Sequence, residues 1–504
     1  MKSSIETRCW RALALVGLVA LAGCNLSGSK GSIDTVLTPT DGDVAQTADG
    51  SEETQQKYTF DALRKADPQA RIGAAQHPKI LAAYGGAYEN EELEKTLALI
   101  TGRLVAQSSD AARAYDITVL DSPTVNAFAL PGGYLYITRG LLALANDSSE
   151  VAAVLAHEMA HVSANHGIDR ARANKAQTIA ERVANTVVSN PVAGQVVKAS
   201  SNRRLAAFSQ QQELEADAIG IRMTGQAGFD AYAGARFLES MDRFNRWRSA
   251  QTSGAEAEMS SSHPSTPRRV ELAKRHARQF GPPGSGERNQ ARYLRGIDGL
   301  LFGEKASEGF VRGQRFAHAK LAITFSVPDG FTLANKAKAV LANGPSQQAL
   351  RFDAVPRSGG QAAADYLKSG WVNGLDESSV SAGKVNGLPM ATGRAAAGDW
   401  QFALTVVATK KRFYRFILAA PRSATGVERT AKAIRDSFRS LSQAEVARLK
   451  PLRVKVVKVG AGDSVTRLAK TMPDVGAAES LFRALNELGP TQEPKRGSLV
   501  KVVR

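Results

Sequence analysis

Residues 151–162 read VAAVLAHEMAHV, an apolar run that carries two histidines four positions apart. Residues 147–150 (DSSE) precede the run and predict a capping box at the start of a helix. On a helix, residues i and i+4 lie one above the other, so His157 and His161 can reach one metal ion. Glu158 lies beside the first histidine and can take a proton from an attacking water. The alternative is a chance match, which is rare in a chain with only 7 histidines in 504 residues. The HExxH spacing therefore predicts a metal-dependent hydrolase.

A third candidate ligand follows further along the chain. A hydrolytic zinc site needs three protein ligands and an open fourth position. Residues 208–220 read FSQQQELEADAIG and place Glu213 and Asp217 four positions apart on a predicted helix. Glu213 would complete a His-His-Glu set, and Asp217 would orient a ligand imidazole through a hydrogen bond. The alternative for any single glutamate is a solvated helix face, which is our interpretation of Glu215.

These motifs together resemble metallopeptidase family forty-eight, a gluzincin family. The resemblance rests on NAFALPGGYLYITRGLL before the HEMAH motif, on ELEAD after it, and on HPSTPRRV from position 263, and it covers about residues 60–280. It implies zinc, one ion per chain, on His157, His161 and Glu213, with Glu158 as general base. It also implies an edge strand that pairs with an extended substrate backbone through residues Asn126, Ala127, Phe128 and Ala129.

His263 has three open interpretations and Arg269 has two. His263 precedes a proline in a Ser-rich loop, and it would either occupy the fourth zinc position in a resting enzyme or stabilise the oxyanion. Arg269 would neutralise the oxyanion. The alternatives are a loop histidine and a surface arginine. Among the other histidines, His166 is predicted to be structural or to support a ligand, whereas the surface is predicted for His77, His276 and His318.

The N-terminal segment predicts a lipid anchor. Lys2 and Arg8 precede an apolar run at 12–21 that is too short to span a bilayer, which is typical of a signal peptide. The run ends in Leu-Ala-Gly-Cys24, similar to the lipobox of bacterial lipoproteins, in which the cysteine is acylated. An ordinary signal peptide that happens to contain a cysteine is the alternative. The residue after the cysteine is Asn25, and by the same resemblance to bacterial lipoproteins it favours sorting to the outer membrane. Residues 25–56 have the composition of a flexible tether.

Composition limits the class of protein. A 504-residue chain with 43% hydrophobic and 22% charged residues is globular, of about three domains, and neither wholly disordered nor polytopic in the membrane. A net charge of +17 favours acidic surfaces such as lipid headgroups or wall polymers. Aromatic residues make up only 6%, which argues against a nucleic-acid-binding platform. Both cysteines lie in the first 24 residues, so no disulfide framework is expected.

Two accessory domains are expected after the catalytic part. Period-2 alternation predicts a small α+β domain over 298–446, with a faint resemblance to PsbP-type folds. Residues 447–504 predict a β-α-α-β order, and GDSV at 462–465 with a later Leu-Asn resembles a degenerate lysin motif (LysM), which would bind peptidoglycan. The alternative is that the basic residues of this segment only solvate the tail.

The expected fold class is a multidomain α+β protein. Its parts are a signal peptide (1–24), a tether (25–56), a mainly α-helical zincin-type domain with a small edge sheet (57–280), a linker (281–297), an α+β domain (298–446) and a LysM-like domain (447–504). The expected function is a zinc endopeptidase, tethered to the periplasmic face of the outer membrane, that cleaves misfolded envelope proteins, with no nucleic-acid partner. A largely non-catalytic envelope chaperone or peptidoglycan-binding scaffold is the alternative.

Overall fold

The computed structural model describes residues 70–109, 113–170, 172, 191–250, 263–336, 339–473 and 475–504, and for 191–208 the backbone alone. Contacts within the chain group residues 58–504 into one unit and residues 1–57 into another. The predicted signal peptide, the tether and Cys24 lie outside the described residues. None of the helices in the described part combines the length and the hydropathy that a membrane span requires.

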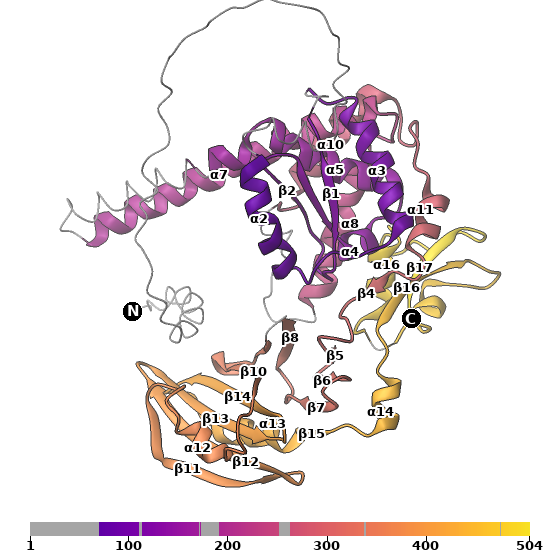
Figure 1. The fold of residues 1–504 in the computed structure, drawn as a ribbon. Helices are drawn as coiled ribbons and strands as arrows, with labels where there is room; N and C mark the ends of the chain where they lie inside the picture. Colours follow the sequence, from indigo (N-terminus) through magenta and orange to yellow (C-terminus); the bar gives the residue numbers. More distant parts are fainter. Residues whose placement is uncertain are drawn as a thin grey trace, which may run out of the picture. The chain divides into compact units, whose positions relative to one another are not determined.

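Helices dominate the region that carries the HExxH motif (Figure 1). These helices are α2 (Ala70–Ala83), α3 (Glu91–Val105), α4 (Arg139–Leu144), α5 (Ser148–Ser163), α7 (Pro191–Gln226), α8 (Ala233–Ser249), α10 (Pro267–Ala277) and α11 (Gln290–Ile297). The Asn90 side chain caps α3 by accepting a hydrogen bond from the Leu93 N–H. The apolar residues of α3 recur at helical spacing and are buried: Leu93, Leu97, Ile100 and Leu104.

A three-stranded sheet accompanies these helices, in the order β1-β3-β2. Its strands are β1 (Asp116–Leu120), β2 (Ala127–Leu130) and β3 (Tyr134–Thr138), with β1 parallel and β2 antiparallel to β3. The turn between β2 and β3 requires glycine, because Gly133 has φ +77° and an added Cβ would lie 2.0 Å from the Ala114 carbonyl oxygen. The tight turn leaves β2 at the edge of this sheet.

Helix α5 is buried along nearly its whole length. The Asp147 side chain caps it by accepting a hydrogen bond of 2.9 Å from the Glu150 N–H, as the sequence predicts. The Glu150 carboxylate accepts from the Asn146 N–H (2.8 Å) instead of the cap residue, so only half of the predicted capping box forms. These two hydrogen bonds fix the residue at which the HExxH helix begins.

Two antiparallel sheets make up most of the region after residue 300. The seven-stranded sheet has the order β11-β12-β13-β14-β10-β9-β8, and its strands are β8 (Thr332–Lys336), β9 (Ala339–Asn343), β10 (Ala349–Pro356), β11 (Leu375–Val385), β12 (Leu388–Ala397), β13 (Trp400–Ala408) and β14 (Arg412–Pro421). The four-stranded sheet has the order β15-β7-β6-β5, with β5 (Phe310–Arg312), β6 (Arg315–His318), β7 (Ile323–Ser326) and β15 (Arg439–Ser440). Three helices belong to this region: α12 (Ala363–Leu367), α13 (Val427–Ser437) and α14 (Gln443–Arg448). The α+β class is confirmed.

The C-terminal segment has the predicted β-α-α-β order. Its elements are β16 (Leu452–Lys458), α15 (Val465–Ala469), α16 (Ala478–Leu485) and β17 (Leu499–Val503). Strand β16 pairs with β17 and also with the short strand β4 (Leu301–Phe302). Buried side chains of this segment, such as Phe482, belong to the same apolar core as Leu155 of α5 and Phe237 of α8. The segment therefore packs as part of the region that carries HExxH.

Candidate metal centre

Four side chains from three parts of the sequence bring their donor atoms together. His157 and His161 come from α5, Glu213 comes from α7, and His263 lies just before α10. One donor atom from each lies within 4.8 Å of the other three. The Nε2 atoms of His157 and His161 are 3.1 Å apart, and Nδ1 of His263 is 3.3 Å from Nε2 of His157 and 2.9 Å from Oε2 of Glu213. The helical spacing accounts for the first pair, and packing of α5, α7 and α10 accounts for the rest.

The donor set fits zinc. Zinc binds histidine nitrogen and carboxylate oxygen at about 2.0–2.2 Å in a tetrahedron, which separates the donors by about 3.3–3.6 Å. The donor separations above are close to those values. Glu213 Oε1 is buried without a hydrogen-bond partner among the described residues, although it lies 3.4 Å from Nε2 of His161. A buried carboxylate oxygen in that position is costly unless a cation or donor satisfies it.

Asp217 and Arg269 orient the donor side chains through hydrogen bonds and charge contacts. Asp217 Oδ1 lies 3.0 Å from Nδ1 of His157, so it accepts that ring N–H and turns Nε2 toward the other donors. The Arg269 guanidinium donates two hydrogen bonds of 2.7 Å to Asp217 and lies 3.0 Å from Oε2 of Glu213. Arg269 is only 3% exposed, so the surface alternative for it is wrong.

His161 has its own support. Its Nδ1 lies 2.9 Å from Nδ1 of His166, and one of the two rings donates to the other. The Gln212 amide holds the segment in place by donating to the His166 carbonyl (3.2 Å). The sequence prediction that His166 is structural or supports a ligand agrees with this contact. His318, predicted to lie on the surface, is buried and accepts a hydrogen bond from the Leu321 N–H, so that prediction is wrong.

The charge states of the ligands follow from their neighbours. Burial opposes ionisation of Glu213, but the neighbouring rings of His157, His161 and His263 outweigh it and hold the pKa of this carboxyl well below its usual range. Burial likewise disfavours the charged form of His157, but hydrogen bonds to Asp217 and Glu213 raise its pKa to about 10. Burial lowers the pKa of His161. Glu213 is therefore a carboxylate, the form that binds a metal ion.

A cavity of about 450 Å³ opens beside the donors. Glu158 and His161 line it together with Asn126, Phe128 and Ala129 of the predicted substrate strand. Glu158 is 2% exposed, and its Oε1 has no hydrogen-bond partner among the described residues and lies 3.7 Å from Nε2 of His263. An unpartnered carboxylate oxygen at the wall of a cavity is placed to accept a proton from a molecule bound there.

Among the described residues, strand β2 pairs with β3 alone and so has an unpaired edge beside this cavity. The Thr138 N–H donates to the Asn126 carbonyl (3.0 Å), so the backbone groups of Asn126 face β3. By the period of two, the backbone groups of Ala127 and Ala129 face away from β3. The Asn126 side chain is 5% exposed, its Nδ2 donates to the Tyr84 hydroxyl, and its Oδ1 is without a partner in the described part of the chain. Of the four predicted substrate residues, Ala127 and Ala129 are thus the ones whose backbone groups face away from β3.

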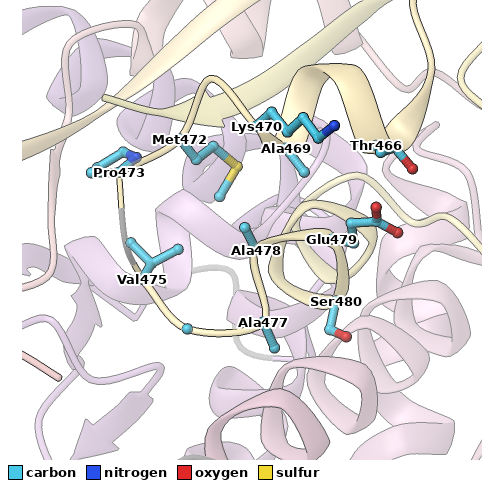
Figure 2. Close-up of a pocket in the computed structure, with 11 residues that line it drawn as sticks. Thr466, Ala469, Lys470, Met472, Pro473, Val475, Ala477, Ala478, Glu479 and Ser480 are labelled. Atoms are coloured by element: carbon cyan, nitrogen blue, oxygen red, sulfur yellow. The ribbon is translucent and has the colours of Figure 1, made fainter.

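A second hollow lies in the C-terminal segment, far along the sequence from the donors. It measures about 310 Å³ and is formed by α15, α16 and the loop between them. Figure 2 shows the polar side chains of Thr466, Lys470 and Glu479 on one side and Met472 and Val475 on the other. The Trp247 indole donates to the Gly476 carbonyl in this loop (2.9 Å), which ties the loop to α8.

The comparisons with known proteins agree with this geometry. Residues 89–277 match the model of Peptidase family M48, so this part of the chain is similar to that metallopeptidase family. Mitochondrial metalloendopeptidase OMA1 of Schizosaccharomyces pombe is 30% identical over 207 residues, which are 40% of this chain and 59% of that protein. The beta-barrel assembly-enhancing protease of Yersinia pestis is 30% identical over 195 residues, which are 36% of this chain and 38% of that protein. The chain thus spans about 40–60% of the length of these relatives.

Similarity to solved structures is weak. The solution structure of cyanobacterial PsbP from Synechocystis matches with a TM-score of 0.22 and 15% identity, covering 27% of this chain and 98% of that one.

Proposed function

We propose that the protein is a zinc endopeptidase. The observation that carries the proposal is the set of His157, His161 and Glu213 donors beside a cavity whose wall holds the unpartnered Glu158 oxygen. Similarity to named metalloendopeptidases supports the same activity. Zinc, when bound by these donors, would act as a Lewis acid on the scissile carbonyl.

The residues around the cavity supply the remaining steps. The free edge of β2 would hold the substrate as an added strand through Ala127 and Ala129. Glu158 would take the proton of the attacking water and return it to the leaving amine. Asp217 and Arg269 would keep the ligands in the productive orientation. Because Arg269 is bonded to Asp217 and lies against Glu213, we assign it a positioning role in place of the oxyanion contact that the sequence suggested.

His263 would be a resting-state ligand. Its Nδ1 lies among the other three donors, where a fourth zinc ligand belongs, and this leaves no position open for water or substrate. Displacement of His263 from this position would then open the site. This arrangement favours the inhibitory interpretation over oxyanion stabilisation.

The proposed substrates are misfolded or misassembled proteins of the bacterial cell envelope. The name of the Yersinia pestis relative refers to beta-barrel assembly, which supports this substrate class. A lipid on Cys24 and the tether after it would hold the enzyme at the periplasmic face of the outer membrane.

The second candidate is a largely non-catalytic envelope chaperone or peptidoglycan-binding scaffold. The β-α-α-β order and the hollow of Figure 2 favour glycan binding by a LysM-like segment. Such a scaffold would keep the fold and the metal but would not depend on Glu158.

One experiment separates the two. Wild type and Glu158→Gln are compared for zinc content and for cleavage of casein. We expect one zinc per chain in both proteins and cleavage only by wild type, because an amide cannot take the proton. Glu239→Gln is the control, since Glu239 pairs with Lys274 on the surface and contacts none of the donors. Equal casein cleavage by the Glu158→Gln variant would exclude Glu158 as the base, and a zinc-loaded wild type that never cuts would favour the scaffold.

A further inference from the structure

Two cavities of very different size flank the donors, and His263 is the one described residue that lines both. The larger, of about 450 Å³, has His161 in its wall, and the smaller, of about 40 Å³, has His157. A polypeptide whose scissile bond lies at the donors places one side chain on either side of them. Because His263 lines both cavities, its displacement would open the donors to both of them. This inference rests on the proposed peptidase function.

The larger cavity suits a bulky apolar side chain. Its volume lies within the range of about 300–1,000 Å³ that is usual for ligand pockets with apolar walls. The wall is mostly apolar and includes Ile80, Tyr84, Phe128, Leu130, Val162 and Ile168. The rings of Tyr84 and Phe128 lie 5.3 Å apart and form an aromatic side of this wall. The partnerless Oδ1 of Asn126 can accept a hydrogen bond from the backbone of the same substrate residue.

The smaller cavity accommodates very little. It lies between α5, α7 and α8, and its wall is apolar at Val154, Ile221, Phe237 and Met241 and charged where Asp217 and Arg269 pair behind His157. Its volume of about 40 Å³ is less than a tenth of the 450 Å³ of the larger cavity. We infer that such a space admits a small side chain and excludes a bulky one. Gly234 helps to keep the space open because it has no Cβ.

We propose that these two cavities are the side-chain pockets on either side of the scissile bond. The enzyme then cleaves between a bulky apolar residue and a glycine or alanine. Bulky apolar residues are buried in folded proteins and exposed in unfolded ones. The larger pocket therefore selects unfolded polypeptide segments, and the smaller pocket selects the bond within them.

Gly234→Ala tests the smaller pocket without disturbing the fold. A Cβ at Gly234 would lie 3.8 Å from Cβ of Ala153 and 3.8 Å from Cγ1 of Ile221, which are ordinary contacts. The added methyl group would fill much of the space. Gly102→Ala is the matched control, because Gly102 lies on the exposed face of α3 and an added Cβ there meets nothing within 4 Å.

The measurement uses the full, zinc-loaded chain with internally quenched peptides. The peptides place Phe or Leu next to Gly, Ala, Val or Leu, in both orders, and cleavage sites in unfolded casein are mapped by mass spectrometry. In one of the two orders, we expect peptides that pair Phe with Ala or Gly to be cleaved with a kcat/KM roughly 10-fold or more above that of peptides that pair Phe with Leu. Gly234→Ala should lower kcat/KM for the Ala peptide roughly 10-fold relative to the Gly peptide. Gly102→Ala should leave this ratio unchanged.

Two outcomes overturn the inference, and they are distinguishable from failure of the proposed function. Cleavage without a size preference shows that the cavities are not side-chain pockets. An unchanged Ala-to-Gly ratio in Gly234→Ala shows that the smaller cavity is only an internal space. If zinc-loaded wild type yields no product from any peptide or from casein, the proposed peptidase function fails and the inference fails with it.

Discussion

The ammonium group of Lys501 donates a hydrogen bond of 2.7 Å to the carbonyl oxygen of Ala145, two residues before the cap of the HExxH helix. It also donates to the carbonyls of Ala143 and Leu144 at 2.9 and 2.8 Å. Lys501 is fully buried, so these carbonyls depend on it at the end of α4. Strand β17 thus fixes the residues that lead into the candidate metal centre.

Lys501→Met should destabilise the fold by about 2–4 kcal/mol, because it leaves buried carbonyl oxygens without a donor. We expect a lower midpoint of thermal unfolding and weaker zinc retention. Lys455→Met is the control, since Lys455 is half exposed in the same segment and pairs with Asp298 at the surface. Equal unfolding midpoints for the two variants would contradict a structural role of Lys501.

Glu487 gives a second link between the C-terminal segment and α5. It contacts Arg236 (3.2 Å) and Arg288 (3.2 Å), and both arginines contact Asp147, the cap of α5. We therefore expect that removal of residues 447–504 prevents the remaining chain from folding. A soluble, zinc-binding protein that ends at residue 446 would show that the segment is independent.

Asp217→Asn should weaken zinc binding about 10- to 100-fold, the usual cost of losing a carboxylate that orients a ligand histidine. The amide keeps the size of the side chain but loses the charge that pairs with Arg269 and His157. Competition with a chromogenic chelator measures the change, and Glu239→Gln should bind zinc as wild type does. Unchanged affinity in Asp217→Asn would remove the positioning role.

His263→Ala separates the two interpretations of this histidine. If His263 is a resting-state ligand, the variant retains zinc on the other three ligands and cleaves casein several-fold faster than wild type. We expect this increase. A fall in turnover with zinc still bound would instead assign His263 to the transition state, and an unchanged rate would remove both roles.

Glu304 predicts a pH dependence of stability. Burial raises its pKa to about 7, although the Val311 N–H donates to it and Arg312 lies nearby. The folded state then binds more protons than the unfolded state between the ordinary pKa of about 4.5 and pH 7. The contribution of protonated Glu304 to the free energy of unfolding is complete below pH 4.5 and is lost as the pH rises through about 7.

Glu304→Gln removes this titration. At pH 8 the variant should be more stable than wild type by about 1–3 kcal/mol, and at pH 5 the difference should be much smaller. Thermal unfolding at the two pH values measures it, with the exposed Glu428→Gln as control. A difference that does not change with pH would contradict the predicted titration.

Cys24→Ser should release the protein from membranes, because Cys24 is the thiol of the lipobox-like segment. Fractionation after a salt wash measures the release and separates a lipid anchor from electrostatic adsorption by the net charge of +17. A variant that stays with the membrane would show that another part of the chain provides the attachment.

Local spacing made several features predictable. The i, i+4 positions of His157 and His161 on one helix face follow from helix geometry alone. The side chain of Asp147 caps a helix for the same local reason. His318 was misjudged because its position at the end of β6, paired with Ile323 of β7, carries no signal in the spacing of the histidines.

The sequence by itself determined the residue types of the metal centre and the helix that presents two of them, because those features depend on neighbours within one helical turn. Only the tertiary structure decided that His263 reaches His157 across 106 positions, that Arg269 bonds Asp217, and that Lys501 supports the chain before α5. Such contacts form when separate helices and strands bury their apolar faces together, and no spacing within one segment encodes which faces will meet.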